Sequence, residues 1–220
     1  MPESLFGIPT QAFLGQLLLG LVNGSFYAML SLGLAVIFGL LGIVNFAHGA
    51  LYMIGAYVAW VGMEKFGINY WVSLLLAPLI VGALGVAIER TLLKHLYKID
   101  PIYGLLLTFG LALIAEGVFR DQFGVSGQSY SVPDALAGVL AAPVIQITPL
   151  MGSNLIIIVF AVVVIGGMGS ILGSILTGLA LGLIEGLTKV FYPEASSIVV
   201  FVIMAIVLMI RPAGLFGKER

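Results

Sequence analysis

Two long runs without a formal charge constrain this chain more than any other feature of its sequence. The first covers the sixty residues between Glu3 and Glu64, and the second covers the fifty residues between Asp134 and Glu185. A helix that crosses a membrane needs about 20 apolar residues, because the hydrocarbon core is about 30 Å thick. Each run is long enough for two or more crossings, so the sequence predicts a polytopic membrane protein of the all-α class.

The amino-acid composition excludes a soluble globular domain. Hydrophobic residues make up 61% of the 220 residues and charged residues only 9%, whereas soluble chains contain roughly 25% charged residues. The net charge of −1 provides no basic surface for nucleic acid. The chain contains no cysteine, which excludes disulfides, iron–sulfur ligation and thiol chemistry.

We predict one transmembrane domain over residues 1–220, built as a helix bundle of about seven spans (roughly six to eight). The piece 135–150 is also apolar, but Pro143 and Pro149 interrupt it, so a re-entrant segment is an alternative to a crossing there. The predicted spans lie near residues 12–38, 49–63, 70–88, 103–119, 155–169, 171–189 and 196–210.

The basic residues predict the orientation, because cytoplasmic connections of membrane proteins are enriched in lysine and arginine. Placing the connection 89–100 and the C-terminal tail in the cytoplasm puts six of the nine basic residues there. These six are Arg90, Lys94, Lys98, Arg211, Lys218 and Arg220. The same orientation places the connections at 64–69, 120–154 and 190–195 outside.

Small residues recur every four positions in three rows, a spacing that places them on one face of a helix. Such rows let helix backbones approach closely in a membrane, so close packing explains them, and sliding during a transport cycle is the functional alternative. The rows are Gly20, Gly24 and Ala28; Gly169, Gly173 and Thr177; and Gly178, Gly182 and Gly186. We expect the hinge at Gly166, Gly167 and Gly169, with Gly173 beside it, because glycine tolerates large backbone changes.

The stretch 39–49 places Asn45 and His48 within reach of the membrane, beside three glycines. Polar groups at that depth usually face protein or a water-filled cavity, and glycines permit a break between two helices. The alternative is an ordinary cytoplasmic loop in which Asn45 caps a helix and His48 contacts headgroups. We predict that both residues line a substrate path if the break exists.

Glu116 and Glu185 are the acidic residues nearest to the interior of predicted spans. Either could line the same path, but each has a basic partner four residues later, Arg120 or Lys189, and pairing is the simpler interpretation. No nucleophile–base pair, metal-ligand spacing or phosphate-binding loop occurs in the sequence. We therefore predict no enzyme activity, no metal and no cofactor on this chain.

Three motifs in order along the chain, NFAHG at 45–49, IGGMGS at 165–170 and RPAGLFG at 211–217, carry a family resemblance. Together with their surroundings at 23–59, 89–120, 162–187 and 209–219, they resemble the branched-chain amino acid ABC transporter permeases of the LivH type. The resemblance covers most of the chain, and the motifs occur in the same order as in the family.

The resemblance implies the membrane subunit of an ATP-driven importer in a bacterial inner membrane, working by alternating access. The implied partners are a second related permease, cytoplasmic ATPase subunits that hydrolyse the ATP, and a periplasmic solute-binding protein. The implied substrates are leucine, isoleucine, valine or related solutes such as urea and short amides. The alternatives are a passive small-solute channel and a permease remnant that does not transport.

The sequence departs from the family pattern between Pro133 and Ala135. There the outer loop joins almost directly to the end of an outward span, so an inward span, a basic cytoplasmic segment and most of an outward span are missing. Because the resemblance implies that this segment docks on the ATPase, we predict impaired coupling to ATP hydrolysis. The shortened piece 134–150 is the predicted weak point of the fold.

Overall fold

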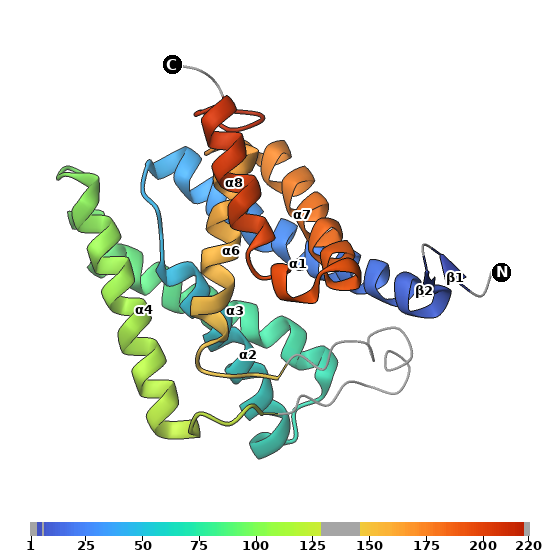
Figure 1. The fold of residues 1–220 in the computed structure, drawn as a ribbon. Coiled ribbons are helices and arrows are strands. Elements are labelled where there is room, and N and C mark those ends of the chain that lie inside the picture. The colour runs from blue at the N-terminus through green and yellow to red at the C-terminus, as the bar shows by residue number, and fades with distance from the viewer. Residues whose placement is uncertain (1–3, 6, 129–145, 218–220) are drawn as a thin grey trace. The chain divides into compact units, whose positions relative to one another are not determined.

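The structure is a computed structural model that describes residues 4–5, 7–128 and 146–217. Within these residues it is helical, as predicted, and each of the seven predicted spans coincides with an α-helix (Figure 1). The helices are α1 (Thr10–Leu41), α2 (Ala47–Phe66), α3 (Tyr70–Thr91), α4 (Pro101–Phe123), α6 (Met151–Gly166), α7 (Ile171–Phe191) and α8 (Val199–Ile210). Short elements complete the fold: the strands β1 (Ser4–Leu5) and β2 (Ile8–Pro9), and the 3-10 helices η1 (Leu93–His95) and η2 (Pro193–Ala195).

Four of the described helical segments are long and apolar enough to cross a membrane: Thr10–Leu40, Tyr70–His95, Pro101–Phe123 and Ile171–Phe191. The helices α6 and α8 are apolar but shorter. A multi-pass membrane protein is therefore confirmed, and the count of about seven spans stays a prediction for the remaining helices. The junction between Pro133 and Ala135 lies outside the described residues, as does most of the piece 135–150.

The helices form two compact units. The first contains Met1–Gly42 and Ile157–Arg220, and the second contains Ile43–Ile156. The boundaries fall at the break after α1 and within α6.

In the first unit, the small residues of α1 pack directly against those of α7. A Cβ atom added at Gly20 would lie 2.7 Å from the carbonyl oxygen of Gly182, and one added at Gly178 would lie 2.6 Å from the backbone nitrogen of Ala28. Positions late in α1 face positions early in α7, so the helices run antiparallel. The row 20–24–28 and the row 178–182–186 thus form one close-packed seam, as expected of small residues in membrane helices.

In the second unit, α2 packs against α3 and α4. Its core is a cluster of buried side chains from α2, from the start of α6 and from the residues before α6, namely Met53, Tyr57, Ile147 and Met151. Aromatic rings of α2 and α4 surround Tyr57, with the ring centres of Phe119 and Phe123 each 4.8 Å from its own. This apolar core fixes α4 beside α2 and so positions the polar groups described below.

Candidate functional site

The predicted break between two helices is present at residues 42–46. Gly42 ends α1 with a φ of +67°, a left-handed conformation that glycine adopts without strain. The backbone then stays non-helical until α2 begins at Ala47. Phe46 occupies the N-cap position of α2 and no side chain caps the helix, so the alternative in which Asn45 caps it is wrong.

Helix α4 anchors this break through a residue that the sequence analysis missed. The fully buried Thr108 hydroxyl accepts a hydrogen bond from the backbone N–H of Phe46 at 3.2 Å. The same oxygen lies 3.4 Å from the carbonyl of Val44 and 3.1 Å from that of Leu105, either of which can accept its proton. Thr108 therefore satisfies backbone groups that the break removes from helical pairing.

Residues before and after Thr108 in α4 also pack against the break. Gly104, one turn earlier, leaves room for Ile43, whose Cγ2 atom would lie 3.0 Å from an added Cβ. Phe109 stacks edge-on against Phe46, with ring centres 6.1 Å apart. Residues 43–46 of the break thus have a defined structure within the second unit.

The two predicted path residues occupy this break and the first turn of α2. The Asn45 side-chain oxygen is buried and has no hydrogen-bond partner among the residues that the structure describes, while the Asn45 backbone carbonyl accepts a bond from the His48 N–H at 3.2 Å. His48 is half-buried. A buried amide oxygen without a partner is costly, so it marks a place where a hydrogen-bond donor would be stabilising.

Glu116 of α4 is held by two partners within the second unit. Its Oε1 atom forms an ion pair with Arg120 at 2.5 Å, and its Oε2 atom accepts a hydrogen bond from the Ser153 hydroxyl of α6 at 2.6 Å. Glu185 of α7 is held in the same way within the first unit. It pairs with Lys189 at 2.6 Å and accepts a bond from the Tyr27 hydroxyl of α1 at 2.8 Å.

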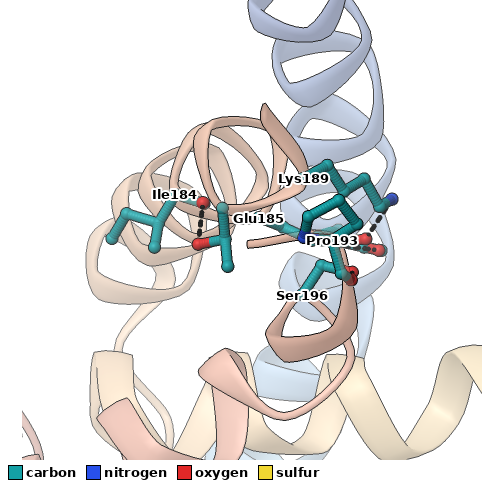
Figure 2. A network of polar contacts seen from close by, with 7 residues as sticks. Ile184, Glu185, Lys189, Pro193 and Ser196 are labelled. Carbon is teal, nitrogen blue, oxygen red and sulfur yellow. Dashed lines mark hydrogen bonds and ion pairs between the residues drawn. The ribbon is translucent and has the colours of Figure 1, made fainter. Parts of the chain in front are cut away.

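Figure 2 shows the ion pair between Glu185 and Lys189 of α7, and the hydrogen bond from the Ser196 hydroxyl to the Pro193 carbonyl in the residues that follow that helix. The i, i+4 pairing that the sequence favoured is therefore present for both glutamates. The hydroxyl partners were not foreseen, because Tyr27 and Ser153 are far from them in sequence.

The four predicted hinge glycines lie together around the turn between α6 and α7. Gly166 and Gly173 contact each other through their backbones, and Gly167 and Gly169 have φ values of +99° and +83°. A side chain at any of these positions would clash or be strained, so glycine is required there by the geometry. Movement at this turn stays a prediction.

The C-terminal tail closes over that turn. The backbone N–H groups of Leu215 and Phe216 donate to the carbonyls of Ile165 and Gly166, at 2.8 and 3.1 Å. These carbonyls belong to the last turn of α6 and have no partner within the helix. Two motifs that lie far apart in sequence, IGGMGS and RPAGLFG, thus form one packed structure in the first unit (Figure 1).

The described residues contain no group of three His, Cys, Asp or Glu side chains that could hold a metal ion. What these positions offer is non-covalent: a stabilised helix break, an unpaired amide oxygen, two paired carboxylates and a glycine turn.

Comparison with known proteins gives one family. The family described as "Branched-chain amino acid transport system / permease component" matches residues 16–134 and 131–208. The chain is 23% identical over 295 residues to the high-affinity branched-chain amino acid transport system permease protein BraD of Pseudomonas aeruginosa, with 94% of this chain and 96% of that protein covered. It is 24% identical over 297 residues to LivH of Escherichia coli K12, with the same coverage. No solved structure matches.

The matches also locate a gap. The two matched pieces meet at residues 131–134, where the sequence analysis places the junction. Because 94% of the 220 residues is about 207, an alignment of 295 positions leaves about 88 positions without a residue of this chain. The chain is therefore shorter than these relatives in its interior.

Proposed function

This chain belongs to the family of branched-chain amino acid transport permease components, and on that basis we propose that it is the permease subunit of an ATP-driven importer. The observation that carries the proposal is the family match on both sides of the gap, in a chain with four helices apolar enough to span a membrane. The proposed substrates are branched-chain amino acids or related small solutes.

The proposed mechanism is alternating access, in which helices move so that a solute site opens to one side and then to the other. The break at 42–46 supplies the solute site: Thr108 holds the backbone, and the unpaired amide oxygen of Asn45 offers an acceptor to an ammonium or amide N–H. The turn with Gly166 and Gly167 supplies the hinge. Helix breaks are used for solute binding in other transporter folds.

The proposed partners follow from the family. Importers of this type contain cytoplasmic ATPase subunits, which hydrolyse the ATP, and a periplasmic binding protein that delivers the solute. We propose in addition a second, related permease as the other half of the membrane domain, and the bacterial inner membrane as the location. No cofactor is assigned to this chain itself.

Uptake of labelled leucine into proteoliposomes tests the proposal. The vesicles contain this chain with a partner permease, ATPase subunits and binding protein, and uptake is measured with ATP and with a non-hydrolysable analogue. ATP-dependent uptake is the expected result. Equal uptake with ATP and with the analogue would refute the importer and favour the passive channel. No uptake by a folded, membrane-inserted chain would favour the third hypothesis, a permease remnant that does not transport.

One specific observation favours the hypothesis of a permease remnant that assembles with its partners but does not transport. The alignment to BraD leaves about 88 positions without a residue of this chain, and the two pieces of the family match meet at residues 131–134, where the resemblance implies a missing segment that contacts the ATPase. We expect weakened coupling, so the ATPase should co-purify in less than stoichiometric amounts. Inserting the corresponding segment of a relative between Pro133 and Ala135 should restore it, and stoichiometric co-purification without the insert would refute this expectation.

A further inference from the structure

Helices α4 and α7 carry the same polar pattern at a constant offset of 69 residues. Each pattern begins with a glycine, and a threonine follows four residues after it. A Glu-Gly pair begins eight residues after the threonine, and a basic residue stands four residues after the glutamate. The corresponding pairs are Gly104 and Gly173, Thr108 and Thr177, Glu116 and Glu185, Gly117 and Gly186, and Arg120 and Lys189.

Three of the corresponding pairs have similar burial or pairing, each within its own unit. The other contacts differ: the Thr108 hydroxyl bonds the break whereas the Thr177 hydroxyl has no partner among the described residues, and Gly186 packs against α1 whereas nothing described lies within 4 Å of a Cβ added at Gly117. Both glycines at the start of the pattern are buried, and both threonines are at least 95% buried. Both glutamate side chains are 12% exposed. The glutamate lies about 12 Å along the axis from its threonine in either helix, because each residue of an α-helix adds about 1.5 Å.

The partners of the two glutamates are equivalent in kind although they differ in sequence. One carboxylate oxygen is paired with the cation four residues later on the same helix, and the other accepts a hydrogen bond from a hydroxyl on a neighbouring helix. That hydroxyl comes from Ser153 of α6 in the second unit and from Tyr27 of α1 in the first.

We propose that α4 and α7 are equivalent helices of an internal repeat, and that each carries the same interhelical latch. The first latch is Glu116 with Arg120 and Ser153, and the second is Glu185 with Lys189 and Tyr27. The glutamates and their hydroxyl partners are positioning residues that fix α4 against α6 and α7 against α1. Repeated structural units of this kind are common in membrane transporters.

The geometry favours a latch over a solute ligand. Both oxygens of each carboxylate already have a partner at 2.5–2.8 Å, so a solute ammonium would have to displace one of them. A carboxylate in a membrane span is costly unless it is paired, which makes the hydroxyl and the cation mutually supporting partners. By contrast, the Asn45 amide oxygen has no partner within the described part of the chain.

A double-mutant cycle on each latch tests the proposal by thermal unfolding of the purified full chain in lipid nanodiscs. The variants are Glu116→Gln, Ser153→Ala and their combination, and Glu185→Gln, Tyr27→Phe and their combination. Each single variant should lower the unfolding midpoint by about 2–4 °C. Each double variant should lower it by less than the sum of its two singles, because Gln replaces the charged acceptor of the same hydrogen bond by a weaker neutral one and the other variant removes its donor.

Matched controls separate the latch from general effects of the substitutions. Glu194→Gln and Tyr192→Phe alter exposed residues just after α7, and Ser25→Ala alters an exposed serine whose hydroxyl donates to the Leu21 carbonyl of its own helix. These controls should shift the midpoint by less than about 1 °C. Coupling in one latch but not in the other would overturn the equivalence, and additive effects in both would overturn the latches.

Leucine uptake supplies a second readout, which rests on the proposed function. With uptake expressed per folded transporter, the Tyr27→Phe and Ser153→Ala variants should lower Vmax several-fold and leave KM within about twofold. A tenfold rise in KM with an unchanged unfolding midpoint would make the carboxylates solute ligands and overturn the proposal. If the unaltered chain takes up no leucine, the proposed function fails while the unfolding cycles still decide the latches.

Discussion

Replacing Gly178 by alanine should force α1 and α7 apart. An added Cβ would lie 2.6 Å from the backbone nitrogen of Ala28 and 2.7 Å from its Cα. Packed carbon atoms are separated by about 3.5–4.0 Å, so the helices must separate by about 1 Å. The obstructing atoms belong to backbone and cannot turn aside, and overpacking of this kind costs about 1–3 kcal/mol.

Gly15→Ala is the matched control for this substitution, because it makes the same chemical change in α1 where nothing lies within 4 Å of the added atom. Both variants gain the same helix propensity, about 1 kcal/mol in favour of alanine. The propensity cancels in the comparison, so Gly178→Ala should be less stable than Gly15→Ala by about 1–3 kcal/mol.

Equilibrium unfolding of both variants in mixed micelles, followed by circular dichroism, measures that difference. Unfolding free energies within about 0.5 kcal/mol of each other would refute the backbone contact between α1 and α7. A still larger side chain, in Gly178→Val, should increase the loss, and a loss that does not grow with side-chain volume would point to a cause other than packing.

Three further changes have definite expected outcomes. Thr108→Val removes the hydroxyl that accepts from the Phe46 N–H and should cost about 1–3 kcal/mol in unfolding free energy, whereas Thr108→Ser should recover most of it; equal losses would contradict the anchoring role. Leu215→Pro removes the N–H that donates to the Ile165 carbonyl. Amide hydrogen exchange at residues 166–170 should therefore be several-fold faster in this variant than in the control Leu215→Ala. Equal exchange rates in the two variants would argue against closure of the turn by the tail. Burial and the hydrogen-bonded Glu89 raise the pKa of Tyr97 above 10, so the phenol ionises at a lower pH in the unfolded chain than in the folded chain. The contribution of Tyr97 to stability should therefore be complete below pH 10 and decrease above it, and the stability of Tyr97→Phe should decrease less steeply. Identical pH profiles of stability for the two proteins would show that Tyr97 does not contribute.

The helices could be predicted because their cause is local. A charge-free run of sufficient length has to satisfy its own backbone in lipid, and a helix does so within one segment. The break was predictable for a related reason, since Gly42 adopts a left-handed conformation that marks a helix end. The prediction of close packing at the small-residue rows is confirmed at Gly20 and Gly182.

The partners of the polar residues could not be predicted, because they come from distant parts of the chain. Tyr27 and Glu185 are separated by 158 residues, and no spacing within one helix reports such a pair. Thr108 resembles any other threonine in an apolar span until the structure places it beside Phe46. The match between α4 and α7 was different: its signal is present in the sequence, and a search for similarity at a fixed offset finds it.

The ends of the undescribed stretch 129–145 bear on what the shortening changes. Gln128 and Ile147 exchange both backbone hydrogen bonds, at 2.9 and 3.0 Å, and Ile147 is buried in the core around Tyr57. Residues 128 and 147, which flank the stretch 129–145, therefore lie side by side.

A missing pair of crossings, one inward and one outward, would begin and end on the same side of the membrane. Its loss therefore leaves the orientation of α6, α7 and α8 unchanged. This agrees with the distribution of basic residues, which assigns the C-terminal tail to the cytoplasm. Under our proposal, the shortening then acts on contact with the ATPase, and the insertion and fold of the remaining helices are preserved.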